Sequence, residues 1–247
     1  MKPCLLIPIY NHGSTIASVV ESLEYLDLPC LIVDDGSDAA TRAELDRIEK
    51  AHDWISVKHR ERNGGRGAAL RTGYFWAHER GFTHAVQLDA DDQHDARDVP
   101  RLLEAAQKDP HALVLGRPLF DDSAPALRMF GRKISQFFVW VETLSMAIED
   151  PLCGFRCFPL AETVELLSAD PLGDRMDLDP EIAVRLYWEG LPIVSVPTKV
   201  RYHEGGLSHF AVGYDSWLIA KAHFRLVSGM LTRIPQLLSR RSAGGAR

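Results

Sequence analysis

Short apolar runs that end at polar residues alternate with helical patterns along much of the chain. Runs of this length suit strands that are buried on both faces of a sheet. The runs expected to form strands are Cys4–Tyr10, Leu31–Val33, Ile55–Val57, Ala85–Leu88, Ala112–Gly116 and Ile193–Pro197. Strands that alternate with helices predict an α/β fold with a Rossmann-like, mostly parallel central sheet flanked by helices.

Between these runs, apolar residues recur at three- and four-residue steps, which is the spacing of one helix face. In the segment that begins at Ser14, for example, Ile16, Val19 and Leu23 share a face. The segments expected to be helical are Ser14 to about Leu26, Thr41 to about His52, a helix opened by residues 62–70 that runs to about Arg80, Val99–Lys108, Leu127–Ile148 and Asp177–Trp188. The segment Cys153–Cys157 shows neither pattern and is expected to be a loop.

A cluster of carboxylates follows the apolar run Ala85–Leu88. Asp89, Asp91, Asp92 and Asp95 fall within seven residues, where a strand of a parallel sheet would end. Ligands bind beyond these strand ends in open α/β sheets. The carboxylates repel one another unless a cation lies among them, and Mg²⁺ or Mn²⁺ suits oxygen ligands and bridges to substrate phosphates. The pattern favours a metal site over a solvated acidic turn.

A glycine-rich turn precedes the helix that runs to about Arg80. It contains Gly64, Gly65 and Gly67. Glycines before a helix let backbone N–H groups approach an anion, and the helix dipole favours negative charge there. A tight turn that needs positive φ explains the same glycines equally well. Arg66 adds a cation that suits a diphosphate.

Composition and charge exclude several classes of protein. A chain of 247 residues fits one domain with a short appendage, here expected as 1–213 and 214–247. The net charge of −6 argues against a nucleic-acid partner. No apolar run approaches the ~20 residues that span a bilayer, and the N-terminus lacks a signal-peptide pattern, so the chain is expected to be cytoplasmic. The four cysteines are not spaced for zinc and are expected to be reduced thiols.

Five segments in order resemble the motifs of family 2 glycosyltransferases with a GT-A fold, and among them the branch that includes dolichol-phosphate mannose synthase. The similarity covers about residues 3–210, and the combination of Asp-Asp-Gly-Ser with the later Asp-x-Asp is its most specific part. The segments are Ile7–Asn11, Val33–Ser37, Asn63–Leu70, the Asp89-x-Asp91 motif and Asp150–Phe158 with its Gly-Phe-Arg core.

This resemblance implies roles for individual residues. The metal, Mg²⁺ or Mn²⁺, would be held by Asp89, Asp91 and Gln93. The nucleotide-diphosphate sugar would be bound by Pro8, Tyr10, Asn11, Asp35, Arg66, Asp89 and Ala90. An acceptor phosphate would be bound by Arg117, Arg132, Ser135 and Arg201, with Lys133 as an alternative to Arg132. Two positions depart from the family pattern: His12 stands where Glu is usual, and Arg66 replaces a Lys, which keeps the charge but changes its geometry.

The expected activity is metal-dependent, inverting transfer of a sugar to a polyprenyl phosphate or a similar lipid acceptor. A phosphate acceptor is already anionic and needs cations to position it, whereas a hydroxyl acceptor needs a carboxylate base. The candidates for such a base are Asp150, Asp177, Asp179 and Glu181. The residues expected to act in catalysis under these alternatives are Asp91, Arg117, Asp150 and Asp179. A hydroxyl of another lipid or glycan stays open as the acceptor, as do, more remotely, a nucleotidyltransferase and a non-catalytic nucleotide-sugar binding module.

The C-terminal segment has an apolar helical face and a basic composition. Its apolar residues recur at Trp217, Ala220, Phe224, Val227, Leu231, Ile234 and Leu238, and no acidic residue follows Asp215. A basic amphipathic helix suits an anionic membrane surface, so we expect a peripheral protein at the inner face of the cytoplasmic membrane. The alternative is that this face packs on the catalytic domain or on a second subunit of a homodimer. Pro235 is expected to bend the helix.

Overall fold

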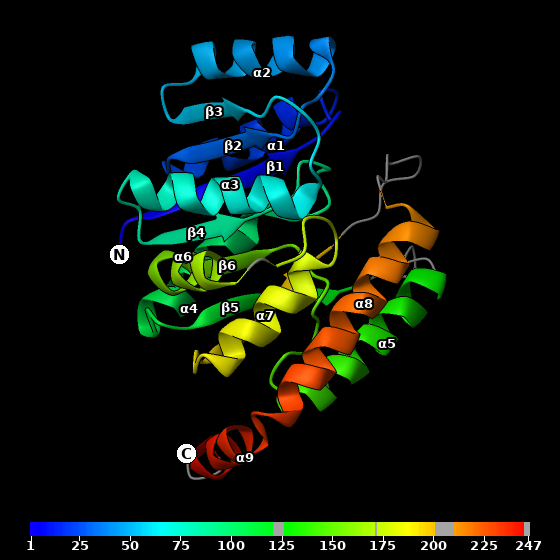
Figure 1. The fold of residues 1–247 in the computed structure, drawn as a ribbon. Helices are drawn as coiled ribbons and strands as arrows, with labels where there is room; N and C mark the ends of the chain where they lie inside the picture. Colours follow the sequence, from blue (N-terminus) through cyan, green and yellow to red (C-terminus); the bar gives the residue numbers. More distant parts are fainter. Residues whose placement is uncertain (121–125, 171, 201–209, 245–247) are drawn as a thin grey trace.

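A seven-stranded mixed sheet runs through the molecule in the order β3-β2-β1-β4-β6-β5-β7 (Figure 1). The computed structural model describes residues 1–120, 126–170, 172–200 and 210–244. The strands are β1 (Pro3–Ile9), β2 (Cys30–Asp34), β3 (Ile55–His59), β4 (His84–Gln87), β5 (Leu113–Leu119), β6 (Arg156–Pro159) and β7 (Ile193–Lys199). Neighbouring strands run parallel except where β6 pairs with β4 and β5. The expected mostly parallel α/β sheet is confirmed.

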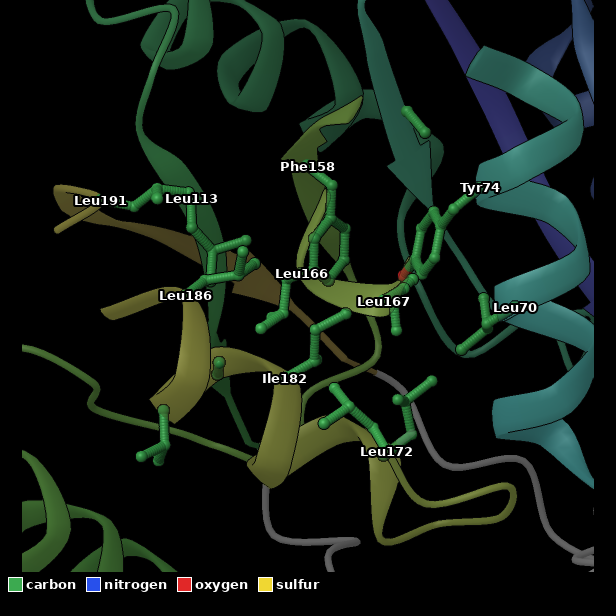
Figure 2. Close-up of a cluster of buried hydrophobic side chains, with 14 of the residues drawn as sticks. Leu70, Tyr74, Leu113, Phe158, Leu166, Leu167, Leu172, Ile182, Leu186 and Leu191 are labelled. Carbon is green, nitrogen blue, oxygen red and sulfur yellow. The ribbon is translucent and has the colours of Figure 1, made fainter. Parts of the chain in front are cut away.

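Helices cover both faces of this sheet (Figure 1). They are α1 (Ile16–Leu23), α2 (Ala39–Ala51), α3 (Arg66–Glu79), α4 (Val99–Lys108), α5 (Ala126–Thr143), α6 (Leu160–Ala169), α7 (Leu178–Trp188), α8 (Val212–Leu231) and α9 (Ile234–Gly244). Leu5 joins a buried cluster with α1, α2 and α4, whereas Leu6 joins a second cluster with α3, α6 and α7. Figure 2 shows the second cluster, in which the rings of Tyr74 and Phe158 lie 4.9 Å apart. Burial on both faces explains why the strands are apolar throughout.

The strand β6 and the helix α6 escaped the sequence patterns. The segment Cys153–Cys157 was expected to be a loop, yet β6 begins at Arg156 and lies antiparallel between β4 and β5. A strand of four residues that begins with a buried arginine has no recognisable apolar period. All four cysteines are free and buried, and burial raises the pKa of the Cys153 and Cys157 thiols to about 12.

The C-terminal segment forms two helices, and the first of them, α8, lies alongside α5 (Figure 1). The chain leaves the helical path at Thr232 and Arg233, and Pro235 stands in the first turn of α9, where proline is tolerated. Leu226, Met230 and Leu237 join the buried cluster that contains α3, α6 and α7. The domain boundary expected between residues 213 and 214 falls inside the first turn of α8, which begins at Val212.

Much of the apolar face expected on α8 and α9 is exposed. Trp217 is 56% exposed, Phe224 75%, Leu231 61% and Leu238 48%. Ile234 of the same expected face is partly buried and packs against the domain, so the alternative of packing on the catalytic domain holds for part of the face and not for these four side chains. Helix α5 adds Phe130, Ile134 and Phe137, which are also exposed. In the part of the chain that the structure describes, no helix combines the length and hydropathy needed to cross a membrane.

Candidate active site

A pocket of about 440 Å³ opens where β1, β2 and β4 end. Tyr10 follows β1, Asp35 follows β2 and Asp89 follows β4, and parallel neighbours end at one edge of a sheet. The described lining thus contains every expected donor residue except Asn11, whose side-chain oxygen accepts from the amide of Asp38 at 2.8 Å. The other lining residues are Pro8, Ile9, His12, Asn63, Gly65, Arg66, Ala69, Ala90, Asp91, Gln93, Leu152, Arg175, Met176, Asp179 and Phe210.

The glycine-rich turn is held by protein groups. The carboxylate of Asp35 accepts from the amides of Gly64, at 3.0 Å, and Gly65, at 2.7 Å. Burial raises the pKa of Asp35, although these two amides oppose the shift. Gly65 has a φ of +100°, and the amide of Ala68 donates to the carbonyl of Asp174 at 2.9 Å. These amides are occupied, so the tight-turn explanation of the glycines is better supported than an anion cradle.

Arg66 bridges two carboxylates that come from distant parts of the chain. Its Nε and Nη2 donate to Oδ1 of Asp89 at 2.9 and 2.7 Å, and its Nη1 donates to Oδ2 of Asp179 at 2.5 Å. Burial disfavours the charge on Arg66, but the two carboxylates outweigh burial and raise its pKa. A lysine has no planar fork and could not hold both partners in this way. Arg66 therefore fixes Asp179, in the first turn of α7, against the end of β4.

The two aspartates of the Asp-x-Asp motif have opposite electrostatic environments. Burial disfavours the ionised form of Asp89, but Arg66 and His94 outweigh it and hold the pKa of Asp89 well below its usual range. Burial, together with the charge of Asp89, raises the pKa of Asp91. A carboxylate that ionises reluctantly beside another is stabilised when a cation binds next to it.

The residues present fit a divalent cation that arrives with a diphosphate. Asp89, Asp91 and Gln93 line one pocket and offer oxygen ligands. Within the described ranges, no three His, Cys, Asp or Glu side chains converge as a complete metal cage. Mg²⁺ and Mn²⁺ do not require one, since hard cations often use one or two carboxylates and take their remaining ligands from water and substrate phosphates.

The Gly-Phe-Arg core, residues 154–156, packs against the pair of Arg66 and Asp89 and supports the backbone around it. A Cβ on Gly154 would lie 2.4 Å from Oδ2 of Asp89 and 2.6 Å from Nη2 of Arg66, so only glycine lets this ion pair form. Arg156 is fully buried and donates to the backbone carbonyls of Pro151, Cys153 and Asp179. These bonds tie the loop before β6 to the start of α7.

The expected acceptor residues lie apart from the described pocket lining. Nε of Arg117 lies 3.6 Å from Glu149, and Arg132 donates to both oxygens of Asp150 at 2.9 Å. Because Glu149 and Asp150 are adjacent, these two arginines gather beside the loop that follows α5. Ser135 is 3% exposed and is bonded to His223 between α5 and α8. Arg201 lies outside the described residues.

Two of the four carboxylates considered as general bases, Asp150 and Asp179, are already engaged. Both oxygens of Asp150 accept from Arg132, and Oδ1 also accepts from the amide of Leu152. Asp179 accepts from Arg66 and is 6% exposed. A general base must reach the proton that it removes. In this arrangement both groups are better suited to hold arginines than to take a proton from a substrate.

Several residues of the site were not predicted from the sequence. Arg60 donates to Asp35, Nε2 of His94 lies 3.6 Å from Oδ2 of Asp89, and Arg175 lines the pocket. The position of His94 directly after the acidic cluster was a usable signal. The sequence gives no such signal for Arg60 and Arg175, because a single arginine in a polar segment cannot be told from an ordinary solvated side chain.

Comparison with known proteins supports this picture. Residues 4–160 match the sequence model of the family described as Glycosyl transferase family 2. The chain is 27% identical over 215 residues to the polyprenol monophosphomannose synthase of Mycolicibacterium smegmatis, which covers 84% of this chain and 80% of that protein. It is 26% identical over 223 residues to the undecaprenyl-phosphate mannosyltransferase of Micrococcus luteus, with 86% and 89% covered.

Solved structures share the fold. The mannosyltransferase PcManGT from Pyrobaculum calidifontis, solved with GDP-Man and Mn²⁺, superposes with a TM-score of 0.58 at 17% identity, covering 99% of this chain and 75% of that one. The TarS fragment 1-349 from S. aureus, solved with UDP-GlcNAc, gives a TM-score of 0.59 at 16% identity, with 94% and 72% covered. The family match extends over more than half of the chain, from β1 to the start of α6. The chain therefore belongs to glycosyl transferase family 2 and is a glycosyltransferase with the GT-A fold.

Proposed function

We propose that this glycosyltransferase is metal-dependent and moves a sugar, with inversion, from a nucleotide-diphosphate sugar to a polyprenyl phosphate. The observation that carries this choice of acceptor is the engagement of the candidate bases. Asp150 is bound by Arg132 and Asp179 by Arg66, which disfavours a hydroxyl acceptor. A phosphate acceptor needs no base, since it is an anion at neutral pH. The relatives named polyprenol monophosphomannose synthase and undecaprenyl-phosphate mannosyltransferase support the same acceptor class.

In this proposal the donor binds across the ends of β1, β2 and β4. Pro8, Tyr10 and Asp35 contact the nucleoside, while Asp89, Asp91 and Gln93 face the diphosphate. A divalent cation bound there would neutralise the charge that develops on the leaving diphosphate. Arg66 keeps Asp89 ionised and oriented for this role. Attack by the acceptor on the face opposite the diphosphate inverts the anomeric centre.

The exposed faces of α5 and α8 support a lipid-borne acceptor. Helix α8 packs on the domain through a mixed side that includes His223, Leu226 and Met230, and leaves Trp217 and Phe224 exposed. Aromatic side chains beside lysine and arginine are typical of helices that lie in the interface of an anionic membrane. Other exposed apolar and aromatic side chains on α5 and α8 include Phe130, Ile134, Phe137, Tyr214 and Leu231. We therefore propose peripheral attachment at the inner face of the cytoplasmic membrane.

Product analysis tests the proposed function. The purified full chain is incubated with Mn²⁺ and either GDP-mannose or UDP-N-acetylglucosamine, the donor classes bound by its structural neighbours. The acceptors are undecaprenyl phosphate in mixed micelles and, in parallel, the matching free alcohol. We expect a sugar phosphate lipid with an inverted anomeric centre from the phosphate alone. Transfer to the alcohol but not to the phosphate would overturn the proposal.

A further inference from the structure

Two guanidinium groups lie in the described lining of the pocket, and only one is fully committed to the protein. Arg66 uses Nε, Nη1 and Nη2 to hold Asp89 and Asp179. Arg175 contributes the other guanidinium, and its side chain is 32% exposed. The expected acceptor arginines, Arg117 and Arg132, are not part of that lining. An anion in this pocket would therefore meet Arg175.

Arg175 is held by Asp215, which is not among the described residues that line the pocket. Its Nε donates to Oδ1 of Asp215 at 2.7 Å, and its Nη2 lies 3.5 Å from Oδ2. The guanidinium also lies over the ring of Tyr214, 5.5 Å from the ring centroid. These contacts fix one edge of the guanidinium, and Nη1 has no hydrogen bond to any residue that the structure describes.

Asp215 is well suited to position this side chain. It is fully buried, and its Oδ2 accepts from the amide of Ala211 at 2.7 Å, which closes the first turn of α8. A carboxylate fixed in this way holds a guanidinium in one orientation. Through this pair, the beginning of α8 is bonded directly to the wall of the pocket.

The surroundings of Arg175 indicate which phosphate it meets. The backbone amides of Gly64, Gly65 and Ala68 are occupied, and the expected metal ligands follow β4. Leu152, Met176 and Phe210 supply apolar lining to the same pocket. Arg175 is also bonded to the helix whose outer face carries Trp217 and is proposed to lie on the membrane. A prenyl phosphate that enters from the lipid surface matches both features of the site, because it has an anion for Arg175 and an apolar chain for the apolar lining.

We infer that Arg175, positioned by Asp215, binds the phosphate of the lipid acceptor. This inference rests on the proposed function and deepens it, because it names the residue that receives the acceptor in the pocket. The other source of the same chemistry is the diphosphate of the donor. The two sources are separated by measuring acceptor and nucleotide binding independently.

The test uses the full-length protein and soluble farnesyl phosphate. Calorimetry measures the Kd of farnesyl phosphate, and separately that of GDP and UDP with Mn²⁺, for the wild type and for Arg175→Gln, Arg175→Lys and Asp215→Asn. We expect Arg175→Gln to weaken farnesyl phosphate binding, and to raise its KM in transfer, by roughly ten- to a hundredfold, the range of one charge-assisted hydrogen bond. The Kd of the nucleotides and kcat at saturating acceptor should change little. Arg175→Lys should restore part of the loss, since it returns the charge without the fork.

Asp215→Asn separates positioning from fold, because asparagine keeps an oxygen for the amide of Ala211 but loses the charge that orients Arg175. We expect an intermediate rise in the acceptor KM. Circular dichroism and thermal unfolding verify that each variant is folded. Arg185→Gln is the matched control, since Arg185 also pairs with an aspartate, Asp170, but is not part of the described lining.

Three outcomes would overturn the inference. If Arg175→Gln is folded and binds farnesyl phosphate as tightly as the wild type, Arg175 does not bind the acceptor phosphate. Loss of nucleotide binding with acceptor binding unchanged assigns Arg175 to the donor diphosphate instead. An equal loss in Arg185→Gln shows a general charge effect. The proposed function fails separately, if the wild type binds farnesyl phosphate through Arg175 yet transfers no sugar to any prenyl phosphate.

Discussion

The hydroxyl of Ser135 on α5 lies 2.7 Å from Nε2 of His223 on α8. Nδ1 of the same imidazole lies 2.8 Å from Oε1 of Glu142, about two helical turns further along α5. Ser135 is 3% exposed, His223 4% and Glu142 0%. Serine, histidine and carboxylate in this order resemble a hydrolytic triad, but a side chain buried between two packed helices does not meet a substrate. The three residues instead join α8 to α5.

Replacement of Ser135 tests this structural role against the acceptor role that the family resemblance implies. Ser135→Ala leaves a buried ring nitrogen without a partner, which costs about 1–3 kcal/mol. We expect the free energy of unfolding in urea to fall by that amount while the KM for prenyl phosphate stays within about twofold. Ser168→Ala on α6 is the control, because its hydroxyl is bonded only within an exposed helix turn. A large rise in acceptor KM with unchanged stability would restore the acceptor role.

The buried carboxyl of Glu142 predicts a pH dependence of stability. Burial raises its pKa above the ordinary value of 4.5, and the bond to His223 opposes the shift. The folded state then binds this proton more tightly than the unfolded state, so the free energy of unfolding falls as pH rises from 4.5 to the raised pKa. Glu142→Gln cannot titrate and should flatten this slope in urea unfolding curves.

Exposed Glu104, which pairs with Lys108 on α4, provides the comparison for Glu142. Glu104→Gln should keep the wild-type slope over the same pH window. If Glu142→Gln also keeps it, the carboxyl of Glu142 is ionised throughout and the raised pKa is wrong.

The sequence predicts the strands of the parallel part of the sheet and the donor side of the pocket, because both follow from local patterns. Apolar runs give β1, β2 and β4, and polar residues at their ends must meet at one edge. Contacts set by tertiary packing leave no such pattern. The pairing of Ser135 with His223 spans 88 positions, and the bridge of Arg66 to Asp179 spans 113. The inward face of α8 was missed because it mixes Asp215 and His223 with leucine and methionine, whereas Trp217, Phe224 and Leu231 of the expected apolar face are exposed.

Metal dependence is tested at Asp91. Asp91→Asn keeps the size of the side chain and removes the charge, and we expect sugar transfer to fall by at least about a hundredfold, since the leaving diphosphate loses its counter-charge. Nucleotide diphosphate binding should become nearly independent of Mn²⁺ in calorimetry. Asp92→Asn, at the adjacent position, should retain the response to metal. Full turnover by Asp91→Asn in the presence of a chelator would contradict the metal assignment.

Membrane attachment is tested on the outer face of α8. Truncation after Asp215 would remove His223, Leu226 and Met230 from the interior, so a loss of binding could reflect unfolding. Trp217→Ser with Phe224→Ser removes two exposed aromatic rings and leaves the packed side intact. Burial of each ring in the membrane is worth about 1.5–3 kcal/mol, so we expect the double variant to bind liposomes at least about a hundredfold more weakly.

Co-sedimentation with vesicles that contain anionic lipid measures this binding. The wild type should bind, and added salt should weaken it because the attraction of Lys221 and its basic neighbours is screened. Tyr25→Ser is the matched control, since Tyr25 is 60% exposed but lies in the segment between α1 and β2. It should bind as the wild type does. If the double variant also binds normally, Trp217 and Phe224 do not enter the membrane. If the wild type does not bind at all but forms a dimer that the double variant abolishes, the face is a subunit interface.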